Sequence, residues 1–382
     1  MISLAQQPLT VFESSNGRFT GDHQTVLNYY KELATLNGEI NVKEMGLTDS
    51  GLPLHLVILD VKMEFDFQKA YDEGRTIVLI NNGIHPGEPD GIEACQMLLR
   101  DYLQDVSKRS LLENVIIAVI PIYNVGGALN RNSFTRVNQV GPEEYGFRGN
   151  ARNFDLNRDF IKADTRNALS FHEIFHYVNP DIFIDTHVSN GADYQYTITH
   201  LITQHNKMGG ELGRYIEQDF TNKLETKMQA KGTEITPYVN VFNTLPDEGF
   251  SQFLDNPRYS TGYAALFNTL GLMIETHMLK PFDVRVKSTY DLLEVMLDIA
   301  VTDGGKIREM KLARQKDIVA GQTHPVGWRL TKKESKTLQF KGYSGQTIKS
   351  QVTGQQRVIY DNNWPYTKAI PYFKVFVPTD KV

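Results

Sequence analysis

Two histidines and a glutamate lie at positions in the sequence that suit a catalytic metal site. His85 and Glu88 belong to the short loop His85-Pro86-Gly87-Glu88, directly behind the apolar run 77–80, and His187 ends a second strand-like run much later in the chain. Zinc binds imidazole nitrogen and carboxylate oxygen, and a catalytic zinc site uses three protein ligands and leaves a fourth position for water. These residue types in this placement therefore predict a catalytic zinc site.

A second motif competes for the same metal. His172-Glu173-Ile174-Phe175-His176 matches the HExxH pattern, which on a helix places both histidines on one face. A metzincin continues with a glycine and a third histidine, but Asn179 and Ile182 occupy those positions here. We favour two helix-surface histidines, and an endopeptidase that uses His172, Glu173 and His176 remains an alternative.

Arginine and asparagine are concentrated in residues 147–160, Phe-Arg-Gly-Asn-Ala-Arg-Asn-Phe-Asp-Leu-Asn-Arg-Asp-Phe. A guanidinium group is planar, permanently charged and able to bind a carboxylate through two hydrogen bonds. Beside a zinc loop, this segment indicates recognition of an anionic substrate end or of a developing negative charge.

Amphipathic helical segments alternate with short apolar runs along the first three hundred or so residues, which is typical of an α/β domain. The expected strands are 54–61, 76–81, 115–122, 182–185 and 272–275, and the expected helices are 24–36, 91–103, 164–177, 207–231 and 288–300. This order predicts a mixed, mostly parallel sheet with helices on both faces. The candidate zinc motifs fall at strand ends, where open α/β sheets bind their ligands.

The composition changes after a helical pattern at 307–320, which Gly321 ends. The short alternating runs 327–330, 337–340, 356–360 and 372–377 predict a small β-rich module. We therefore expect a catalytic domain at 1–320 and a C-terminal module at 321–382. Trp328 and Trp364 lie in this module, where they suit either a core or an exposed platform for a sugar or peptide, and we favour packing in a core.

The bulk composition excludes several classes of protein. Of the 382 residues, 41% are hydrophobic and 22% charged, and the net charge is -5, which argues against a nucleic-acid-binding protein. The longest apolar stretch, 115–123, is far shorter than the roughly twenty residues that span a bilayer, so no membrane span is expected. Cys95 is the sole cysteine, so a thiolate zinc site is excluded. The expected compartment is extracellular or periplasmic if a signal peptide was trimmed, and cytoplasmic otherwise.

Taken together, these motifs resemble the zinc metallocarboxypeptidases of the carboxypeptidase A superfamily over most of residues 20–305. The resemblance implies that His85 and Glu88, as the family's His-x-x-Glu loop, and His187, in Asp185-Thr186-His187, hold one zinc ion per chain. It also implies that Asn157 and Arg158 bind the terminal carboxylate of the substrate.

The same resemblance assigns roles to the neighbouring residues. Asp155 would support a zinc-bound histidine, Arg148 would polarise the scissile carbonyl and stabilise the oxyanion, and Glu275 would be the general base. Tyr259 or Tyr263 would be the tyrosine that faces the substrate, and Arg258 would be an additional anion contact.

The function that the resemblance implies is zinc-dependent removal of a C-terminal residue from a peptide or peptide-like substrate with a free carboxylate. A zinc amidase or deacylase acting on cell-wall peptides or acylated amino acids is an alternative with the same chemistry. A non-catalytic binding protein that uses the C-terminal module for recognition is a third, less favoured because the ligands, the base and the oxyanion arginine all have counterparts in the chain.

Overall fold

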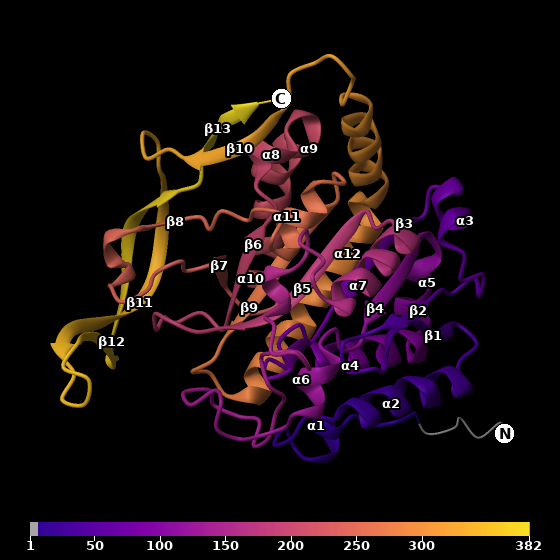
Figure 1. The fold of residues 1–382 in the computed structure, drawn as a ribbon, viewed down its shortest axis with the longest axis horizontal. Coiled ribbons are helices and arrows are strands. Elements are labelled where there is room, and N and C mark those ends of the chain that lie inside the picture. Colours follow the sequence, from indigo (N-terminus) through magenta and orange to yellow (C-terminus); the bar gives the residue numbers. More distant parts are fainter. Residues whose placement is uncertain (1–6, 382) are drawn as a thin grey trace.

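The structure, a computed structural model that describes residues 7–381, is built around a large mixed β-sheet (Figure 1). Within those residues the sheet has eight strands in the order β1-β2-β4-β3-β5-β9-β6-β7. The central strands β4, β3, β5 and β9 run parallel, whereas the β1/β2, β2/β4 and β9/β6 pairs are antiparallel. The strands are β1 (Ile40–Leu47), β2 (Pro53–Leu59), β3 (Thr76–Asn81), β4 (Val115–Ile120), β5 (Ile182–Ser189), β6 (Ile198–Ile202), β7 (Ile235–Pro237) and β9 (Leu270–His277).

The central strands are buried because helices cover both faces of the sheet. Every residue of β3 is buried, and alternate side chains point to opposite faces. Val78 and Ile80 belong to one hydrophobic cluster, and Ile77 and Leu79 belong to another on the opposite face. An uninterrupted apolar run is what a strand covered on both sides requires. The predicted fold class is therefore confirmed.

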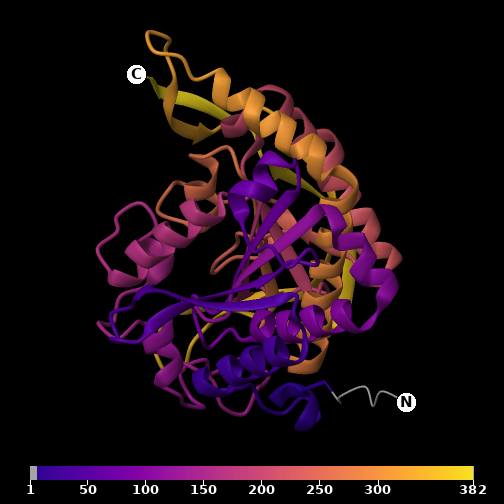
Figure 2. The same cartoon turned by 90° about the vertical axis from the view of Figure 1, so that its right-hand side faces the viewer.

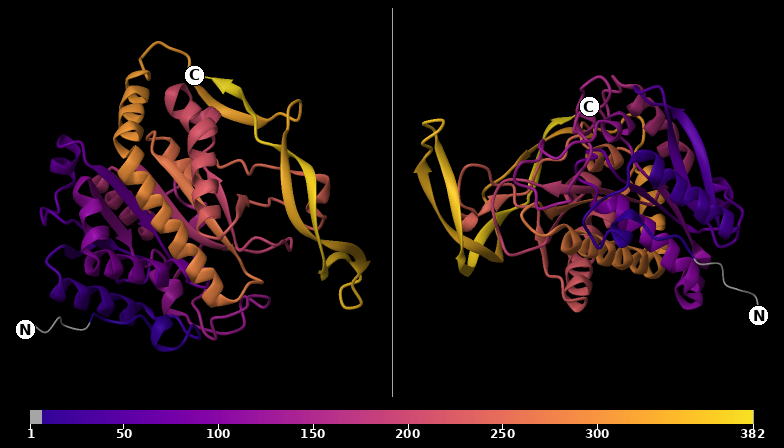
Figure 3. Two further views of the ribbon diagram at one scale, coloured as in Figure 1. Left: turned by 180° about the vertical axis from the view of Figure 1, so that it is seen from behind. Right: turned by 90° about the horizontal axis from the view of Figure 1, so that it is seen from below.

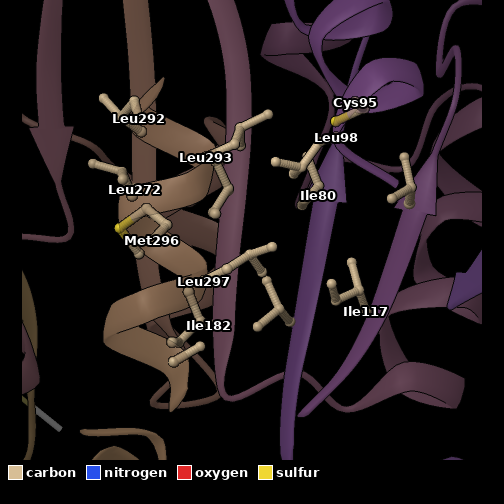
Figure 4. Packing of buried hydrophobic residues seen from close by; sticks show 14 of the residues in the cluster. Ile80, Cys95, Leu98, Ile117, Ile182, Leu272, Leu292, Leu293, Met296 and Leu297 are labelled. Atoms are coloured by element: carbon tan, nitrogen blue, oxygen red, sulfur yellow. The ribbon is translucent and has the colours of Figure 1, made fainter. Parts of the chain in front are cut away.

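Long helices form the layer on one face of the sheet. Leu98 of α4 (Asp90–Gln104) and Leu293 and Leu297 of α12 (Phe282–Lys316) are buried in the cluster that contains Ile80 and Ile182, and all are labelled in Figure 4. Seen from behind, α12 runs obliquely across the sheet (Figure 3, left). The opposite face is covered by α7 (Arg166–Val178) and α11 (Ser260–Ala265), so that the sheet lies between two helical layers (Figure 2).

Three expected helical segments differ from the observed helices. The segments 288–300 and 307–320 are parts of the single helix α12, which ends at Lys316. Gly304 lies inside this helix, where it packs directly on β3: a Cβ at this position would collide with the side chain of Thr76, so the close approach requires glycine. The segment 207–231 is interrupted near its start, where Gly209 and Gly210 have positive φ.

The remaining helical elements are short or connect the main layers. They are α1 (Val11–Ser14), α2 (His23–Leu36), α3 (Phe67–Asp72), α5 (Val106–Leu111), η1 (Leu112–Asn114), α6 (Val125–Leu129), η2 (Leu156–Arg158), α8 (His205–Met208), α9 (Gly210–Tyr215), the π-helical η3 (Ile216–Phe220), α10 (Thr221–Ala230) and η4 (Pro246–Glu248). In the part of the chain that the structure covers, no helix combines the length and apolarity needed to cross a bilayer.

The C-terminal residues form small antiparallel sheets, as the sequence predicts. β10 (Pro325–Leu330) pairs with β13 (Phe376–Lys381), and the long strands β11 (Lys336–Lys349) and β12 (Gln356–Phe373) form a hairpin that lies at one side of the molecule (Figure 1). β12 also pairs with β8 (Phe250–Ser251), which precedes the predicted boundary at residue 320.

This C-terminal segment shares its hydrophobic core with the preceding residues. Phe340 and Ile370 pack in one cluster with Tyr194, Val239 and Phe250. The expectation that both tryptophans lie in a core is wrong for Trp364, which is 67% exposed. The physical reason is that the shared core is located at the base of the hairpin, next to β8.

Candidate active site

The loop between β3 and α4 brings His85 and Glu88 to the carboxyl end of the sheet. The backbone N–H of Glu88 donates to the carbonyl of His85 at 2.8 Å, so the loop closes in a tight turn. Gly87 is needed inside this turn, because a Cβ there would lie 2.8 Å from Arg136 Cδ and 2.9 Å from the carbonyl oxygen of Gly146. The turn therefore fixes both side chains relative to the neighbouring strand β5.

His85, Glu88 and His187 converge in a buried group whose potential ligand atoms all lie within 4.8 Å of one another. His85 Nδ1 is 3.3 Å from Glu88 Oε1, and His187 Nδ1 is 3.2 Å from Glu88 Oε2. Across residues 7–381, this is the one cluster of three or more His, Cys, Asp or Glu side chains with such geometry. Two imidazoles and a carboxylate are a donor set that fits catalytic zinc.

Each of the two histidines is held from behind by a carboxylate. His85 Nε2 lies 2.9 Å from Asp155 Oδ1, and His187 Nε2 lies 2.9 Å from Asp185 Oδ2. Nε2 of each ring is thus committed to an aspartate, which leaves Nδ1 to face the metal position and fixes the tautomer that a ligand needs. Burial alone would raise the pKa of Asp155, but the hydrogen bond to His85 and the charges of His85, Arg148 and Arg158 hold it well below its ordinary value.

Glu275 lies beside this group on the neighbouring strand. It is the Cα partner of His187 in the parallel β5/β9 pair, and its side chain lines the same cleft. Burial raises the pKa of Glu275 to about 7, although the charges of His187, Arg136 and Arg148 act in the opposite direction. A carboxylate with a raised pKa beside a metal position is suited to accepting and returning a proton.

The predicted anion-binding residues line this cleft, which has a volume of about 980 Å³. Arg148 donates from Nε and Nη2 to Asp155 Oδ2 at 3.1 and 2.9 Å, and its Nη1 lies 3.3 Å from His85 Nδ1. Asn157 and Arg158 belong to η2, where the carboxylate of Asp155 accepts from the backbone N–H of Asn157. The side-chain oxygen of Asn157 is buried without a hydrogen-bond partner.

The predicted tyrosines and Arg258 have different surroundings. Tyr259 lines the cleft, and the guanidinium of Arg158 lies 4.9 Å from the centre of its ring. Tyr263 is only 4% exposed, belongs to the core cluster beneath α7 and stacks on His172 with 5.0 Å between ring centres. Arg258 is exposed and is not among the residues that line the cleft. The expected substrate contacts of Tyr263 and Arg258 are therefore corrected, because Tyr263 packs in the apolar core and Arg258 does not line the cleft.

Three residues at the site were not predicted from the sequence. Asp185 supports His187, Arg136 donates to Glu88 Oε1 at 2.7 Å and to the carbonyl of Val188 at 2.9 Å, and Tyr238 lines the cleft. Asp185 could have been found, because it precedes His187 by two residues on the same strand and therefore points to the same face. Arg136 and Tyr238 lie on loops whose course the local sequence does not reveal.

The HExxH motif on α7 lies elsewhere. His172 Nε2 donates to the carbonyl of Phe160 at 2.6 Å, and Glu173 and His176 are exposed. Among the described residues these three side chains form no group with metal-ligand geometry. The described residues therefore give the alternative endopeptidase site no support, and the fold favours the interpretation as helix-surface histidines.

Comparisons with known proteins agree with the fold. Residues 26–203 match the family model described as zinc carboxypeptidase. Carboxypeptidase 2 of Trichophyton rubrum is 26% identical over 187 residues, which cover 46% of this chain and 31% of that protein. Carboxypeptidase 2 of Trichophyton tonsurans is 26% identical over 172 residues, which cover 42% of this chain and 29% of that protein. The aligned region thus spans less than a third of these curated relatives.

Solved structures extend the similarity over more of the chain. A metallo-carboxypeptidase from Burkholderia cenocepacia aligns with a TM-score of 0.53 at 16% identity and covers 72% of this chain and 67% of its own. A metallo-carboxypeptidase from Pseudomonas aeruginosa, in complex with (2-guanidinoethylmercapto)succinic acid, aligns with a TM-score of 0.55 at 15% identity. The alignment covers 76% of this chain and 70% of that chain. The resemblance to the zinc metallocarboxypeptidases, a class of hydrolase, is therefore confirmed in sequence over residues 26–203 and in fold beyond them.

Proposed function

We propose that this protein is a zinc-dependent carboxypeptidase that removes the C-terminal residue from a peptide or peptide-like substrate. The observation that carries the proposal is the convergence in one cleft of a three-ligand group, a facing carboxylate and an anion-binding pair. The three-ligand group is His85, Glu88 and His187. The facing carboxylate is Glu275, and Asn157 with Arg158 form the anion-binding pair.

The chemistry of hydrolysis follows from these positions. Zinc held by the three ligands would supply a water molecule whose pKa is lowered to about 7 and would polarise the scissile carbonyl. Glu275 accepts the proton of the attacking water and later donates it to the leaving amine. Arg148 stabilises the negative charge that develops on the carbonyl oxygen, and a donor placed in this way contributes about 3 kcal/mol to lowering the barrier.

The selection of a terminal residue depends on the carboxylate anchor. Arg158 is partly exposed to the cleft, and its guanidinium can form paired hydrogen bonds with a carboxylate. The side-chain amide of Asn157 is next to it on η2. A free terminal carboxylate bound here would hold the last peptide bond in register with Glu275. The compound in complex with the Pseudomonas aeruginosa protein is a substituted succinic acid, which carries two carboxylic acid groups, and this supports the proposal of a carboxylate-ended substrate.

The test compares peptides with free and amidated C-termini, with and without a chelator. We expect zinc-loaded protein to release only the last residue of the free peptides, and 1,10-phenanthroline to abolish the release until zinc is restored. Charge-assisted hydrogen bonds contribute about 1.5–3 kcal/mol each, so amidated peptides should react about 100-fold more slowly or worse. Equal rates on amidated peptides would contradict the carboxylate anchor, and cleavage of acyl groups alone would favour the amidase alternative.

A further inference from the structure

Two segments that are far apart in the sequence meet in one wall of the cleft. The first is 189–191, at the end of β5, and all three of its residues line the cleft. The second is 238–242, directly after β7. A Cβ on Gly191 would lie only 3.3 Å from the carbonyl oxygen of Val241, so the two segments are in contact. Together they form what we call the cleft wall.

The second segment of the cleft wall turns alternate side chains to opposite sides. The three side chains that line the cleft are those of Tyr238, Asn240 and Phe242. Val239 and Val241 are buried on the other side, in the hydrophobic cluster that contains Phe340 and Ile370 of the C-terminal segment. The ladder between β6 and β7 ends at Pro237, so the position of 238–242 depends on this packing.

The first segment of the cleft wall is connected to the same cluster through Tyr194. The ring of Tyr194 stacks on the ring of His277 with 4.2 Å between ring centres, and its hydroxyl lies 3.0 Å from Ser189 Oγ. Ser189 and His277 are Cα partners in the β5/β9 pair, two residues beyond His187 and Glu275 and therefore on the same face. Tyr194 thus packs on the two strands directly beside the metal group and the base.

The C-terminal segment holds Tyr194 through backbone and side-chain contacts. Tyr194 forms an antiparallel bridge with Gly342, and the backbone N–H of Gln195 donates to the carbonyl of Lys341 at 3.1 Å, so this stretch lies alongside β11 like an added strand. Phe340 of β11 is fully buried, and its ring lies edge-on to the ring of Tyr194 at 6.4 Å. Phe340 therefore lies where β11 supports the back of the cleft wall.

Ion pairs also join the C-terminal segment to the preceding residues, but they are exposed. Lys368 lies 3.1 Å from Asp247 and Lys374 lies 3.2 Å from Glu217, and each of these side chains is at least 20% exposed. Exposed ion pairs contribute little to stability, whereas buried apolar surface contributes in proportion to its area. The apolar cluster around Phe340 is therefore the main support of the cleft wall.

From this arrangement we infer that Phe340 is a positioning residue of the enzyme, which fixes the cleft wall for substrate binding through Tyr194, Val239 and Val241. The inference rests on the proposed function. Residues 321–381 supply none of the side chains that line the cleft, so Phe340 acts only through the wall. Loss of its ring leaves a cavity behind the wall, and a displaced wall binds the substrate less well. The metal group does not belong to this cluster and keeps its own support.

The experiment compares Phe340→Ala with Phe376→Ala in the zinc-loaded full chain. Phe376 is the matched control, because it is 3% exposed in β13 of the same C-terminal segment but is not a member of the cluster. We expect Phe340→Ala to raise KM for peptides with a free C-terminus by about tenfold or more, with a smaller fall in kcat and an unchanged zinc content. Phe376→Ala should keep the wild-type KM. A wild-type KM in Phe340→Ala would overturn the inference, because partial unfolding alone lowers the amount of active enzyme and not KM.

Hydrogen exchange followed by mass spectrometry tests the same positioning without turnover. We expect faster exchange in Phe340→Ala over 189–196 and 238–242 but not over the metal loop 84–88, and wild-type exchange at all three places in Phe376→Ala. If the wild type cleaves no peptide, the proposed function fails, and the exchange decides whether the cluster fixes the wall. Unchanged exchange of the wall in folded Phe340→Ala would refute the positioning role.

Val241→Ala is a smaller deletion at the back of the cleft wall. It removes two methyl groups from the same cluster and leaves Phe340 in place, so KM should rise by about threefold or more and exchange over 238–242 should become faster. If Phe340→Ala does not fold by circular dichroism, Val241→Ala decides the outcome. Wild-type KM together with wild-type exchange in that variant would contradict the inference.

Discussion

The replacement of Glu275 by glutamine separates catalysis from metal binding. The two side chains have nearly the same shape, but the amide cannot accept a proton from water. Glu275 is not a member of the His85, Glu88 and His187 ligand group, so Glu275→Gln should leave zinc binding unchanged. A positioned general base contributes about 10²–10⁴ in rate, which corresponds to about 2.7–5.4 kcal/mol of barrier. Because Glu275 also returns the proton to the leaving amine in our account, we expect a loss near the upper end, about 10⁴-fold in kcat.

The assay is the release of the terminal amino acid from a peptide with a free C-terminus, followed by mass spectrometry, with zinc content measured on the same sample. Glu225→Gln is a suitable control, because Glu225 lies outside the cleft and pairs with His200 at 3.0 Å. It should retain wild-type turnover. If Glu275→Gln kept a tenth or more of the wild-type kcat, the assignment of the base would be refuted, and a loss of zinc would instead make Glu275 a ligand.

Three further perturbations test other parts of the account. Arg158→Met should lower kcat/KM on peptides with a free C-terminus by about 10²–10³, because their carboxylate loses its charge-assisted hydrogen bonds. The slow rate on amidated peptides should change little, so the kinetics of both proteins on both kinds of peptide test the prediction. Arg136→Gln should weaken zinc affinity by about 10–100-fold, because the guanidinium of Arg136 orients Glu88. A competition titration with a chelator measures the affinity, and an unchanged value would exclude this role of Arg136. Asp60→Asn should lower the free energy of unfolding, measured in urea near neutral pH, by about 3–5 kcal/mol, because it leaves the buried guanidinium of Arg75 without its charged partner. A loss below about 1 kcal/mol would contradict the stabilising role of this buried ion pair. Burial would raise the pKa of Asp60, but Arg75 and nearby N–H donors hold this pKa below its ordinary value. The contribution of the Asp60–Arg75 pair to the free energy of unfolding is therefore present above about pH 4 and is lost as the pH falls through the lowered pKa of the folded state.

The fold was predictable wherever burial leaves a periodic pattern in the sequence. The apolar runs 77–80 and 115–120 are buried on both faces as β3 and β4, and the amphipathic segment 91–103 is α4 within a residue or two. The strands β1, β6 and β7, which lie toward the two margins of the sheet, were not expected, because their pairing depends on distant partners and not on local pattern. The two expected helices are one helix, α12, in which Gly304 is placed by its close packing on Thr76 and not by a break in the helix, and the local sequence does not reveal that tertiary contact.

The residues of the candidate site were likewise predictable where they lie in a local motif and not where only tertiary contacts bring them to the site. His85, Glu88 and Asp155 lie in short local motifs, and the structure brings them together with His187 because β3 and β5 are neighbours in the sheet. Arg136 was missed, because it comes from a loop that reaches Glu88 across tertiary space and carries no local signal. Tyr263 was misplaced for the opposite reason, since its spacing from Glu275 is suitable but its side chain is turned into the aromatic core.

The central claim is that His85, Glu88 and His187 hold zinc and that the HExxH histidines do not. The most direct test is the zinc content of purified His85→Ala and His172→Ala after equilibration with zinc and removal of the free metal, with circular dichroism to verify folding. We expect one zinc ion per chain in the wild type and in His172→Ala, and nearly none in His85→Ala. Zinc retained by His85→Ala and lost by His172→Ala would contradict the account.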